Sequence, residues 1–414
     1  MNENPIVGLD VGTTKVTVVC GHVQEGMIQV TGIGNAPNSG LRKGSVVDIE
    51  ETVSAISSAI EEAERSSGTQ IRSCFAAISG SQLVSIDSKG IIAVSRADGE
   101  ISDSDVERVL DAAKSVALPP NNEIIHIVPK MYVVDGQTGI KDPTGMSGIR
   151  LEVQSHVIGV STPTLKNLSK AISQAGLEIE GIVFSAVASA KGFLNKKQKE
   201  IGVILIDIGA SNTSIAVYEE NTLIHSKVIP IGANHITNDL AIGLKISLEA
   251  AEKIKIHEVS AAIEDVKESD KVDLNKYDKN EKEKPNRRYV CEIAEARLNE
   301  LFGMIKDELK LIERDEMLPA GAILVGGGSK LTGLTKYVKA TLGLPTQIGH
   351  LVFEVSGIVD KLDNPEYACA VGLMLWGIDE TQNIMSNKGR PKINLGRAGG
   401  VLDRVKEVFK NLIP

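Results

Sequence analysis

The chain has 414 residues, of which 42% are hydrophobic, 24% are charged and 39 are glycine. A chain of this length exceeds what one hydrophobic core typically holds, so we expect two or more domains. Its composition is that of a globular α/β protein. The net charge of −9 and the aromatic content of only 3% disfavour electrostatic contact with nucleic acid and base stacking, so we expect no nucleic-acid partner.

The N-terminus has no basic and apolar leader of the secretory type, and no apolar run approaches the roughly 20 residues of a membrane span. The four cysteines lie far apart and predict neither a metal site nor a disulfide framework, as in a reducing compartment. They are Cys20, Cys74, Cys291 and Cys369. We therefore expect the body of the protein to lie in the cytoplasm.

The stretch VGLDVGTTKV, residues 7 to 16, places an aspartate, a glycine and two threonines between two apolar strands. These residue types fit an ordinary hairpin, and they also fit a nest of backbone N–H groups that binds phosphate. Asp10 is suited to holding a hydrated Mg²⁺, which prefers few carboxylates together with substrate phosphates. The expected phosphate ligands of this hairpin are Gly12, Thr13, Thr14 and Lys15.

Residues 85 to 161 have the pattern of a compact α+β unit inserted in the first half of the chain. A helix is predicted after Ser102, a good N-cap, with Asp103 and Asp105 in its first turn and apolar side chains behind. Strands are expected on both sides of this helix. The stretch IRLEVQSHVIGVS, residues 149 to 161, alternates in a way that predicts two further strand segments.

The stretch VILIDIGASNTSIAVY, residues 203 to 218, repeats the pattern of the first hairpin. Two copies of an unusual turn favour two related half-domains. If the hairpins face each other, they grip the phosphates of a nucleotide from both sides, with Asp207 as the second carboxylate near Mg²⁺. The other expected ligands in this region are Gly209, Ala210, Ser211, Asn212 and Gly232.

The region that follows contains helical and strongly charged segments. In LEAAEKIKIHEVS, residues 248 to 260, Glu252 and Lys255 share one face of a helix and fit a solvated ion pair. Residues 264 to 288 hold eight acidic and eight basic residues and predict an exposed loop that is poorly ordered. A long amphipathic helix comes next. Its apolar face consists of Ile293, Leu298, Leu301, Ile305 and Leu309.

The stretch AILVGGGSKLTGL, residues 322 to 334, contains a buried strand, three glycines, a Ser-Lys pair and the start of a helix. Glycines let a backbone approach a charged ligand closely, and a helix N-terminus favours anions. A plain strand-to-helix turn has a similar sequence, so this segment indicates a nucleotide only together with the two hairpins. The expected ligands are Gly326, Gly327, Gly328, Ser329 and Lys330.

The C-terminal part of the chain differs from the rest. Residues 379 to 398 are polar, contain Gly and Pro, and predict a linker. Residues 399 to 414 predict an amphipathic helix with a basic side, which suits an anionic membrane surface, although many such helices dock on their own domain. The residues from 388 onward include seven bases and two acids, opposite in sign to the body. The apolar face consists of Val401, Leu402, Val405, Val408, Phe409, Leu412 and Ile413.

The order of these segments resembles the actin, DnaK-chaperone and sugar-kinase superfamily, whose phosphate 1, phosphate 2 and adenosine motifs match the two hairpins and the glycine-rich loop. Residues 179 to 194 and 365 to 377 resemble its two connecting helices. The resemblance implies a two-lobed actin-like α/β fold with duplicated mixed-sheet cores that binds ATP and Mg²⁺, with Glu252 and Lys255 beside the adenosine. It also places Ser185 where relatives carry a water-positioning Glu or Gln, which implies at most weak ATPase activity.

Within this superfamily, the insert and the tethered C-terminal helix resemble the FtsA family of bacterial cell-division proteins. KDPTGMSGIRLEV (141 to 153) and PIGANHITNDLA (230 to 241) also look like segments of that family. The resemblance implies an adaptor that forms actin-like filaments on the inner face of the cytoplasmic membrane at the division site. It also implies binding of the C-terminal tail of the tubulin-like FtsZ, near residues 232 to 310 and the helix around Arg297, and recruitment of later divisome membrane proteins.

The resemblance divides the chain into subdomains, and other members of the superfamily provide alternatives. A membrane-bound actin of the MreB type is the nearest one, but the insert and the C-terminal position of the helix argue against it. A sugar kinase needs a carboxylate base over an acceptor hydroxyl, to which we can assign no segment, and a chaperone needs a peptide-binding domain after the ATPase. The implied boundaries are 1–84, 162–194 and 357–378 for the first core domain (1A), 85–161 for the insert (1C), 195–231 and 311–356 for the second core domain (2A), and 232–310 for a small domain (2B).

Overall fold

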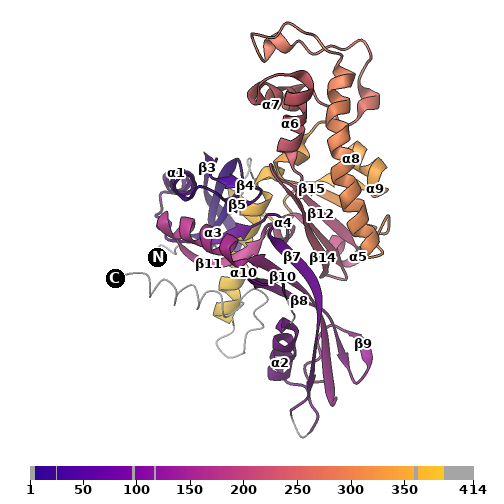
Figure 1. Cartoon of the computed structure of the whole chain (residues 1–414). Helices are drawn as coiled ribbons and strands as arrows, with labels where there is room; N and C mark the ends of the chain where they lie inside the picture. Colours follow the sequence, from indigo (N-terminus) through magenta and orange to yellow (C-terminus); the bar gives the residue numbers. More distant parts are fainter. Residues whose placement is uncertain (1–4, 25, 96–97, 116–117, 359–361, 387–414) are drawn as a thin grey trace.

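The computed structural model describes residues 5–24, 26–95, 98–115, 118–358 and 362–386. Figure 1 shows two lobes side by side, a helical arm above the second lobe, and an elongated sheet with one helix below. The predicted membrane helix, residues 399 to 414, and the linker from residue 387 onward lie outside the described residues. None of the described helices combines the length and the apolarity needed to cross a bilayer.

The first lobe is built on a six-stranded mixed sheet. The strands β1, β2 and β3 form an antiparallel meander, and β6, β11 and β17 extend the sheet in parallel. Helix α1 (Ile49–Ser67) packs on β3, beginning at the N-cap Asp48 and ending at Gly68 in the left-handed conformation. The order across the sheet is β11 (Glu178–Phe184), β6 (Ser73–Ile78), β1 (Ile6–Val11), β2 (Lys15–Gln24), β3 (Met27–Pro37) and β17 (Val355–Gly357).

The second lobe repeats this plan in a five-stranded sheet. A meander of β12, β13 and β14 corresponds to that of β1, β2 and β3, and β15 pairs with β12 in parallel as β6 pairs with β1. The repetition confirms the predicted duplicated mixed-sheet cores. The order across the sheet is β14 (Thr222–Ile229), β13 (Thr213–Glu219), β12 (Val203–Ile208), β15 (Ala322–Val325) and β16 (Thr346–Ile348).

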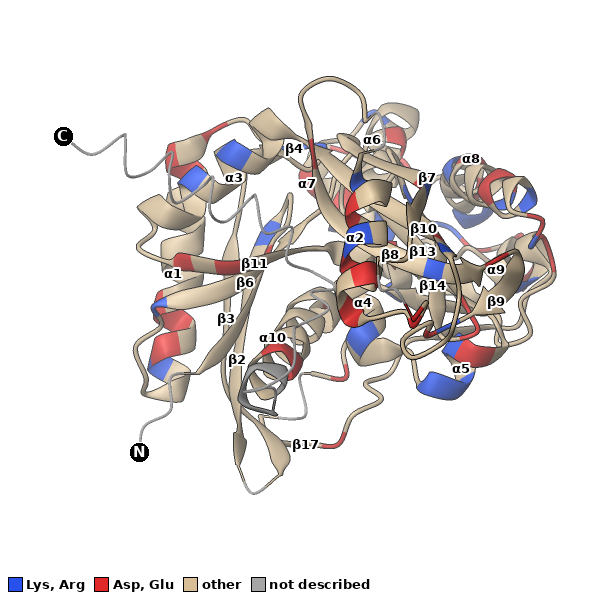
Figure 2. Ribbon diagram, turned by 90° about the horizontal axis from the view of Figure 1, so that it is seen from below, with Lys and Arg blue, Asp and Glu red and all other residues tan. Residues whose placement is uncertain are grey.

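The helical arm consists of α6 (Ala233–Leu244), α7 (Leu248–His257) and α8 (Arg287–Leu311). As predicted for α8, Leu298, Leu301, Ile305 and Leu309 are buried, while Ile293 is only partly buried. Acidic and basic residues lie next to each other along the outside of α8 (Figure 2). The α9 helix (Leu334–Leu342) packs beside α8 on the second lobe.

The charged segment between α7 and α8 does not form the poorly ordered loop that its composition predicts. It contains the short helices η1 (Ile263–Asp265) and η2 (Leu274–Lys276), and Lys271 pairs with Asn286 in an isolated β-bridge. Val272 and Leu274 are fully buried in the core of the arm. These apolar side chains, spaced between the charges, provide the burial that holds the segment in place.

The two lobes are joined by α4 (Ser185–Phe193), which leads to α5 (Lys196–Ile201), and by α10 (Ala368–Ser386). The helices α4 and α10 cross so closely that a Cβ atom at Gly372 would lie 1.8 Å from the Ala188 carbonyl oxygen. The prediction of a linker from residue 379 onward is wrong for residues 379 to 386, because α10 continues through them. The buried residues Leu375 and Ile378 anchor the preceding turns, and the Pro and Gly that break helices come later in the sequence.

The insert forms a separate antiparallel sheet of order β7-β10-β8-β9 with its own core and one helix. Ser102 is the N-cap of that helix, as the sequence predicts, and its backbone N–H and its hydroxyl both donate to the Asp105 carboxylate. The prediction of two strand segments within residues 149 to 161 is wrong, because β10 is one continuous strand with two bulges against β8. The elements are β7 (Leu83–Ala93), α2 (Asp103–Lys114), β8 (Asn122–Val134), β9 (Gln137–Ile140) and β10 (Arg150–Ser161).

The insert also contacts the second lobe, although it branches from the first. The His156 Nε2 atom on β10 lies 2.9 Å from the Ser226 hydroxyl on β14, and the Ser85 hydroxyl donates to the carbonyl oxygen of Ser226. At the edge of this contact, Lys141 forms an ion pair of 2.9 Å with Glu220. The insert therefore bridges the two lobes on the side opposite the helical arm (Figure 1).

Candidate functional site

The two predicted phosphate hairpins face each other across the gap between the lobes. The hydroxyl groups of Thr13 and Ser211, from opposite lobes, lie 2.7 Å apart. Each hairpin is closed in the same way, by a bond from Gly12 N to the carbonyl of Lys15 and from Gly209 N to the carbonyl of Asn212, both 3.0 Å long. The structure therefore brings together the two turns that the sequence repeats.

A cavity of about 480 Å³ opens between these hairpins and the helical arm. This volume lies in the range of small-molecule and cofactor sites. Both hairpins, the glycine-rich loop and the arm contribute to its walls. Of the predicted ligands, those that line it are Asp10, Gly12, Thr13, Thr14, Lys15, Asp207, Gly209, Ala210, Gly232, Glu252, Lys255, Gly326, Gly327, Gly328 and Lys330.

The remaining three predicted ligands lie elsewhere. The Ser211 hydroxyl is bonded to Thr13, as described above, and Asn212 lines a second, smaller cavity. Ser329 is buried, and its hydroxyl donates to the carbonyl of Gly326 at 2.7 Å within η3 (Gly327–Lys330). Ser329 thus stabilises the turn of the glycine-rich loop.

Asp10 and Asp207 lie at the base of the cleft, one from each lobe. Burial raises the pKa of Asp10 to about 6. Burial, and then repulsion from Asp10, raises the pKa of Asp207 to about 7, although the Ser189 hydroxyl donates to its Oδ2 atom at 2.9 Å. Two carboxylates that are costly to ionise without a counter-charge fit a divalent cation that also binds phosphate oxygens. Among the described residues no cluster of three or more His, Cys, Asp or Glu side chains forms a complete metal site.

Glu252 and Lys255 form the ion pair that their spacing predicts, and the pair borders the cavity. The Lys255 Nζ atom lies 2.6 Å from the Glu252 carboxylate and donates to the Thr237 hydroxyl at 3.0 Å. Lys255 is largely buried, and Glu252 also accepts a bond of 2.5 Å from Thr237. These contacts tie α7 to α6 and hold both side chains at the wall of the cavity.

The end of the cavity next to the helical arm is apolar, and the sequence alone did not identify it. Its lining residues, Ile236, Ile256, Leu298, Leu301 and Leu334, look like ordinary core positions of helices in the sequence. The guanidinium of Arg297, which also lines the cavity, donates two bonds of 2.7 and 3.0 Å to the Asp239 carboxylate on α6. An apolar pocket with a fixed planar cation at its wall suits a flat heteroaromatic ring.

The glycines of the glycine-rich loop allow it to lie against the second hairpin. Gly326 has φ +82°, and a Cβ atom there would lie 2.4 Å from the Asp207 carboxylate. A Cβ atom at Gly328 would lie 2.3 Å from the Ile208 side chain. The sequence predicts that these glycines let the backbone approach a ligand. The contacts show that they also let the loop pack directly against β12 (Val203–Ile208).

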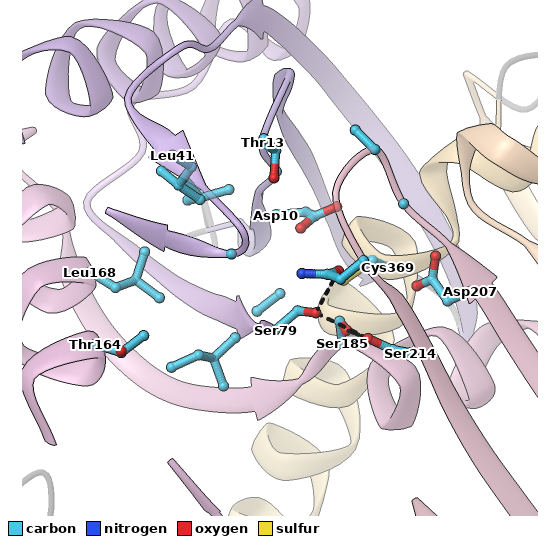
Figure 3. A pocket seen from close by; sticks show the side chains of 18 of the residues that line it. Asp10, Thr13, Leu41, Ser79, Thr164, Leu168, Ser185, Asp207, Ser214 and Cys369 are labelled. Atoms are coloured by element: carbon cyan, nitrogen blue, oxygen red, sulfur yellow. Dashed lines mark hydrogen bonds between the residues drawn. The ribbon is translucent and has the colours of Figure 1, made fainter. Parts of the chain in front are cut away.

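A second cavity of about 100 Å³ lies on the other side of the hairpins and shares Asp10, Asp207 and Cys369 with the first (Figure 3). Ser185, the first residue of α4, points into it and donates to the Ser214 hydroxyl at 3.3 Å. Ser79 lies 3.0 Å from the same hydroxyl. Ser185 is therefore near the carboxylates, but its hydroxyl is not a base, and it is already engaged with another hydroxyl.

Comparison with known proteins identifies the family. The profile described as "Cell division protein FtsA" matches residues 204–372, and that described as "SHS2 domain inserted in FTSA" matches residues 80–159. The cell division protein FtsA of Pseudomonas aeruginosa is 37% identical over 382 residues, which cover 92% of this chain and 91% of that protein. The chain belongs to the FtsA family of bacterial cell-division proteins.

Other FtsA relatives show similar agreement. FtsA of Bacillus subtilis is 35% identical over 375 residues, covering 90% of this chain and 84% of that protein. FtsA of Escherichia coli K12 is 31% identical over 386 residues, covering 91% of both. The family assignment confirms the resemblance seen in the sequence and decides against the MreB-type, chaperone and sugar-kinase alternatives.

Solved structures support the actin-like fold. A "PilM-PilN type IV pilus biogenesis complex" matches with a TM-score of 0.66 and 18% identity, covering 90% of this chain and 98% of that chain. The MreB5 protein of Spiroplasma citri bound to AMPPNP matches with a TM-score of 0.55 and 13% identity, covering 93% and 99%. At these identities the similarity concerns the fold, and it confirms the predicted actin-like fold.

Proposed function

We propose that this FtsA-family protein is an ATP-binding, self-assembling adaptor that tethers FtsZ filaments to the cytoplasmic membrane during bacterial cytokinesis. The observation that carries the ATP site is the convergence of both hairpins and the glycine-rich loop on one cavity between the lobes. An MreB of the same fold, from Spiroplasma citri, was crystallised with AMPPNP and with ADP.

In this proposal the cleft divides into two regions. The backbone N–H groups of the hairpins, with Thr13, Thr14 and Lys15, bind the phosphates, and Asp10 and Asp207 hold Mg²⁺ through its water ligands. The adenosine occupies the apolar end, beside the glycine-rich loop and the pair of Glu252 and Lys255. When bound, Mg²⁺ neutralises the phosphates and the two buried carboxylates.

Calorimetric titration with ATP tests this site. Asp207→Asn removes one of the two carboxylates while preserving the shape of the side chain, so Mg²⁺-dependent ATP affinity should fall about ten-fold or more. Asp111→Asn, an exposed change on α2, is the matched control and should bind like the wild type. A wild-type affinity of Asp207→Asn for ATP in the presence of Mg²⁺ would refute the assignment.

The FtsZ tail is expected to dock on the helical arm. The family resemblance implies a contact near residues 232 to 310 and the helix around Arg297. Because the Arg297 guanidinium is bonded to Asp239 and lines the nucleotide cavity, we propose α6 and α7 as the contact surface. Two large apolar side chains that do not line the cavity are exposed there, accompanied by the exposed Lys245 and Lys253. Such a surface fits an acidic peptide with apolar anchors. The two are Ile242 and Leu248.

A matched pair of variants tests this surface. Ile242 on α6 is 77% exposed, and Ile149 beside β10 of the insert is 78% exposed. Ile242→Glu should weaken binding of an FtsZ tail peptide about ten-fold or more, because it places a charge like those of the peptide at an apolar contact. Ile149→Glu makes the same chemical change outside the arm and should not alter the affinity. Equal behaviour of the two variants would refute the placement.

Membrane attachment and assembly rest on the sequence alone, because the residues concerned lie outside the described part of the chain. The apolar face from Val401 to Ile413, with basic residues beside it, supports reversible binding to an anionic bilayer. Each helix inserts only partly, so a filament that presents many helices should bind far more tightly than one molecule. Recruitment of later divisome membrane proteins, and a location at the division site, follow from the family resemblance.

A further inference from the structure

Lys15 has a defined partner on the wall of the nucleotide cleft. It is the first residue of β2, and its Nζ atom lies 3.6 Å from the Glu366 Oε2 atom. The same Nζ atom lies 4.7 Å from the centroid of the Tyr367 ring. Carboxylate and aromatic face together form a cradle for an ammonium group. We refer to Glu366 and Tyr367, in η4 (Pro365–Tyr367), as the lysine cradle.

The lysine cradle is held in place by its neighbours. Asn364 donates to the other carboxylate oxygen of Glu366 at 3.0 Å, and Asn35 on β3 donates to the Tyr367 hydroxyl at 3.3 Å. Gly326 N, from the second lobe, donates to the carbonyl of Pro365 at 2.9 Å. The cradle is therefore anchored to both lobes, whereas Lys15 reaches it on a flexible stem and is one-third exposed.

Glu366 lines the same cavity as the two phosphate hairpins. A carboxylate at this position repels a polyphosphate, and the ammonium of Lys15 cannot fully neutralise both anions at once. Glu366 can lose its lysine at low cost, because it lies just before the N-terminus of α10, where a negative charge is favourable. The Lys15 ammonium can therefore pair either with the Glu366 carboxylate or with a bound phosphate, and these two anions compete for it.

We propose that Lys15 moves from the lysine cradle to the terminal phosphate of a bound nucleoside triphosphate. Because Glu366 competes with that phosphate for Lys15, Glu366 limits the preference of the site for triphosphate over diphosphate. The inference rests on the proposed ATP site and extends it. A diphosphate leaves Lys15 in its cradle, whereas a triphosphate draws it away. The start of α10, the helix that leads to the C-terminal tail, thereby gains or loses a cation according to the nucleotide bound.

A double-mutant cycle tests this exchange. Dissociation constants for MgATP and MgADP are measured by calorimetry on the full chain for wild type, Glu366→Gln, Lys15→Met and the double variant. Glu366→Gln keeps an oxygen for the bond from Asn364 and releases Lys15. It should tighten MgATP about three- to five-fold, the range of a partly exposed ion pair, and change MgADP less than about two-fold. Lys15→Met should weaken MgATP about ten-fold and remove most of the preference over MgADP.

The decisive comparison is the effect of Glu366→Gln in the Lys15→Met background. The exchange predicts a smaller tightening there than in the wild-type background, because the cation that Glu366 holds is already gone and only the direct repulsion between Glu366 and the phosphates is relieved. An equal tightening in both backgrounds, or none in either, would overturn the inference. Glu107→Gln, the same change at an exposed position on α2, controls for overall charge and should leave all constants unchanged. If wild type binds neither nucleotide, the proposed ATP site itself fails, which is a distinguishable result.

Discussion

The crossing of α4 and α10 offers a sharp test of how the lobes are joined. A Cβ atom at Gly372 would lie 1.8 Å from the Ala188 carbonyl oxygen and 3.1 Å from the Ser189 backbone nitrogen. These are main-chain atoms of a buried helix, so they cannot give way as a flexible side chain does. Gly372→Ala must therefore push the two helices apart.

The magnitude follows from two opposing effects. Alanine in place of glycine favours a helix by about 1 kcal/mol, whereas overpacking against fixed backbone costs about 3 kcal/mol or more. The net loss in the free energy of unfolding should be about 2 kcal/mol. Because α4 carries Ser189, whose hydroxyl bonds to Asp207 at 2.9 Å, displacement of α4 should also weaken MgATP binding, by about ten-fold for one lost hydrogen bond.

A matched glycine on α8 provides the control. At Gly303 a Cβ atom would have no neighbour within 4 Å, so Gly303→Ala should stabilise the chain by about 0.5–1 kcal/mol. Chemical denaturation and calorimetric titration with MgATP measure both effects on both variants. Equal stability of Gly372→Ala and Gly303→Ala, with unchanged ATP affinity, would refute the close crossing and its link to the site.

Three further predictions concern the insert, the chemistry and the tail. Burial lowers the pKa of His156 and of His225 below the ordinary 6.5 despite their partners Asp87 and Glu308, so the folded chain favours neutral rings. The neutral rings therefore stabilise the folded chain above about pH 6.5, and this contribution is lost as the pH falls below that value. In denaturation curves at about pH 7.5 and 5.5, His156→Asn should show a smaller loss of the free energy of unfolding between the two pH values than the wild type. Ser185→Ala should change the rate of any single-turnover hydrolysis of ATP less than about two-fold, because the hydroxyl is no general base, and a ten-fold drop would contradict this. Phe409→Glu should release the protein from anionic liposomes in co-sedimentation without changing ATP affinity, and continued pelleting of a chain truncated after residue 398 would contradict that role of the tail.

Much of the site could be predicted from the sequence because its chemistry lies in short contiguous turns. The strand, aspartate and glycine pattern around Asp10 and Asp207 identifies both hairpins, and their repetition indicates that they pair across two lobes. The signals for helix starts are equally local, as the N-cap at Ser102 shows. In each of these cases neighbouring residues determine the local conformation.

The remaining features depend on contacts between residues distant in sequence. The apolar end of the cleft, the position of Arg297 and the lysine cradle are formed by helices and turns from several regions, and each residue alone looks like an ordinary core or surface position. The charged segment of residues 264 to 288 misled for a related reason. Its net composition predicts disorder, but the burial of Val272 and Leu274 against the arm decides its conformation.

The most direct test of the adaptor function is a three-component sedimentation assay. A labelled FtsZ tail peptide is mixed with anionic vesicles and MgATP, with and without the full chain, and the peptide in the pellet is measured. The proposal predicts that the peptide sediments with the vesicles only when the full chain is present, and that Ile242→Glu and Phe409→Glu each strongly reduce the amount of peptide in the pellet. A full chain that binds the vesicles but leaves the peptide in solution, or binds the peptide but not the vesicles, would contradict the adaptor function.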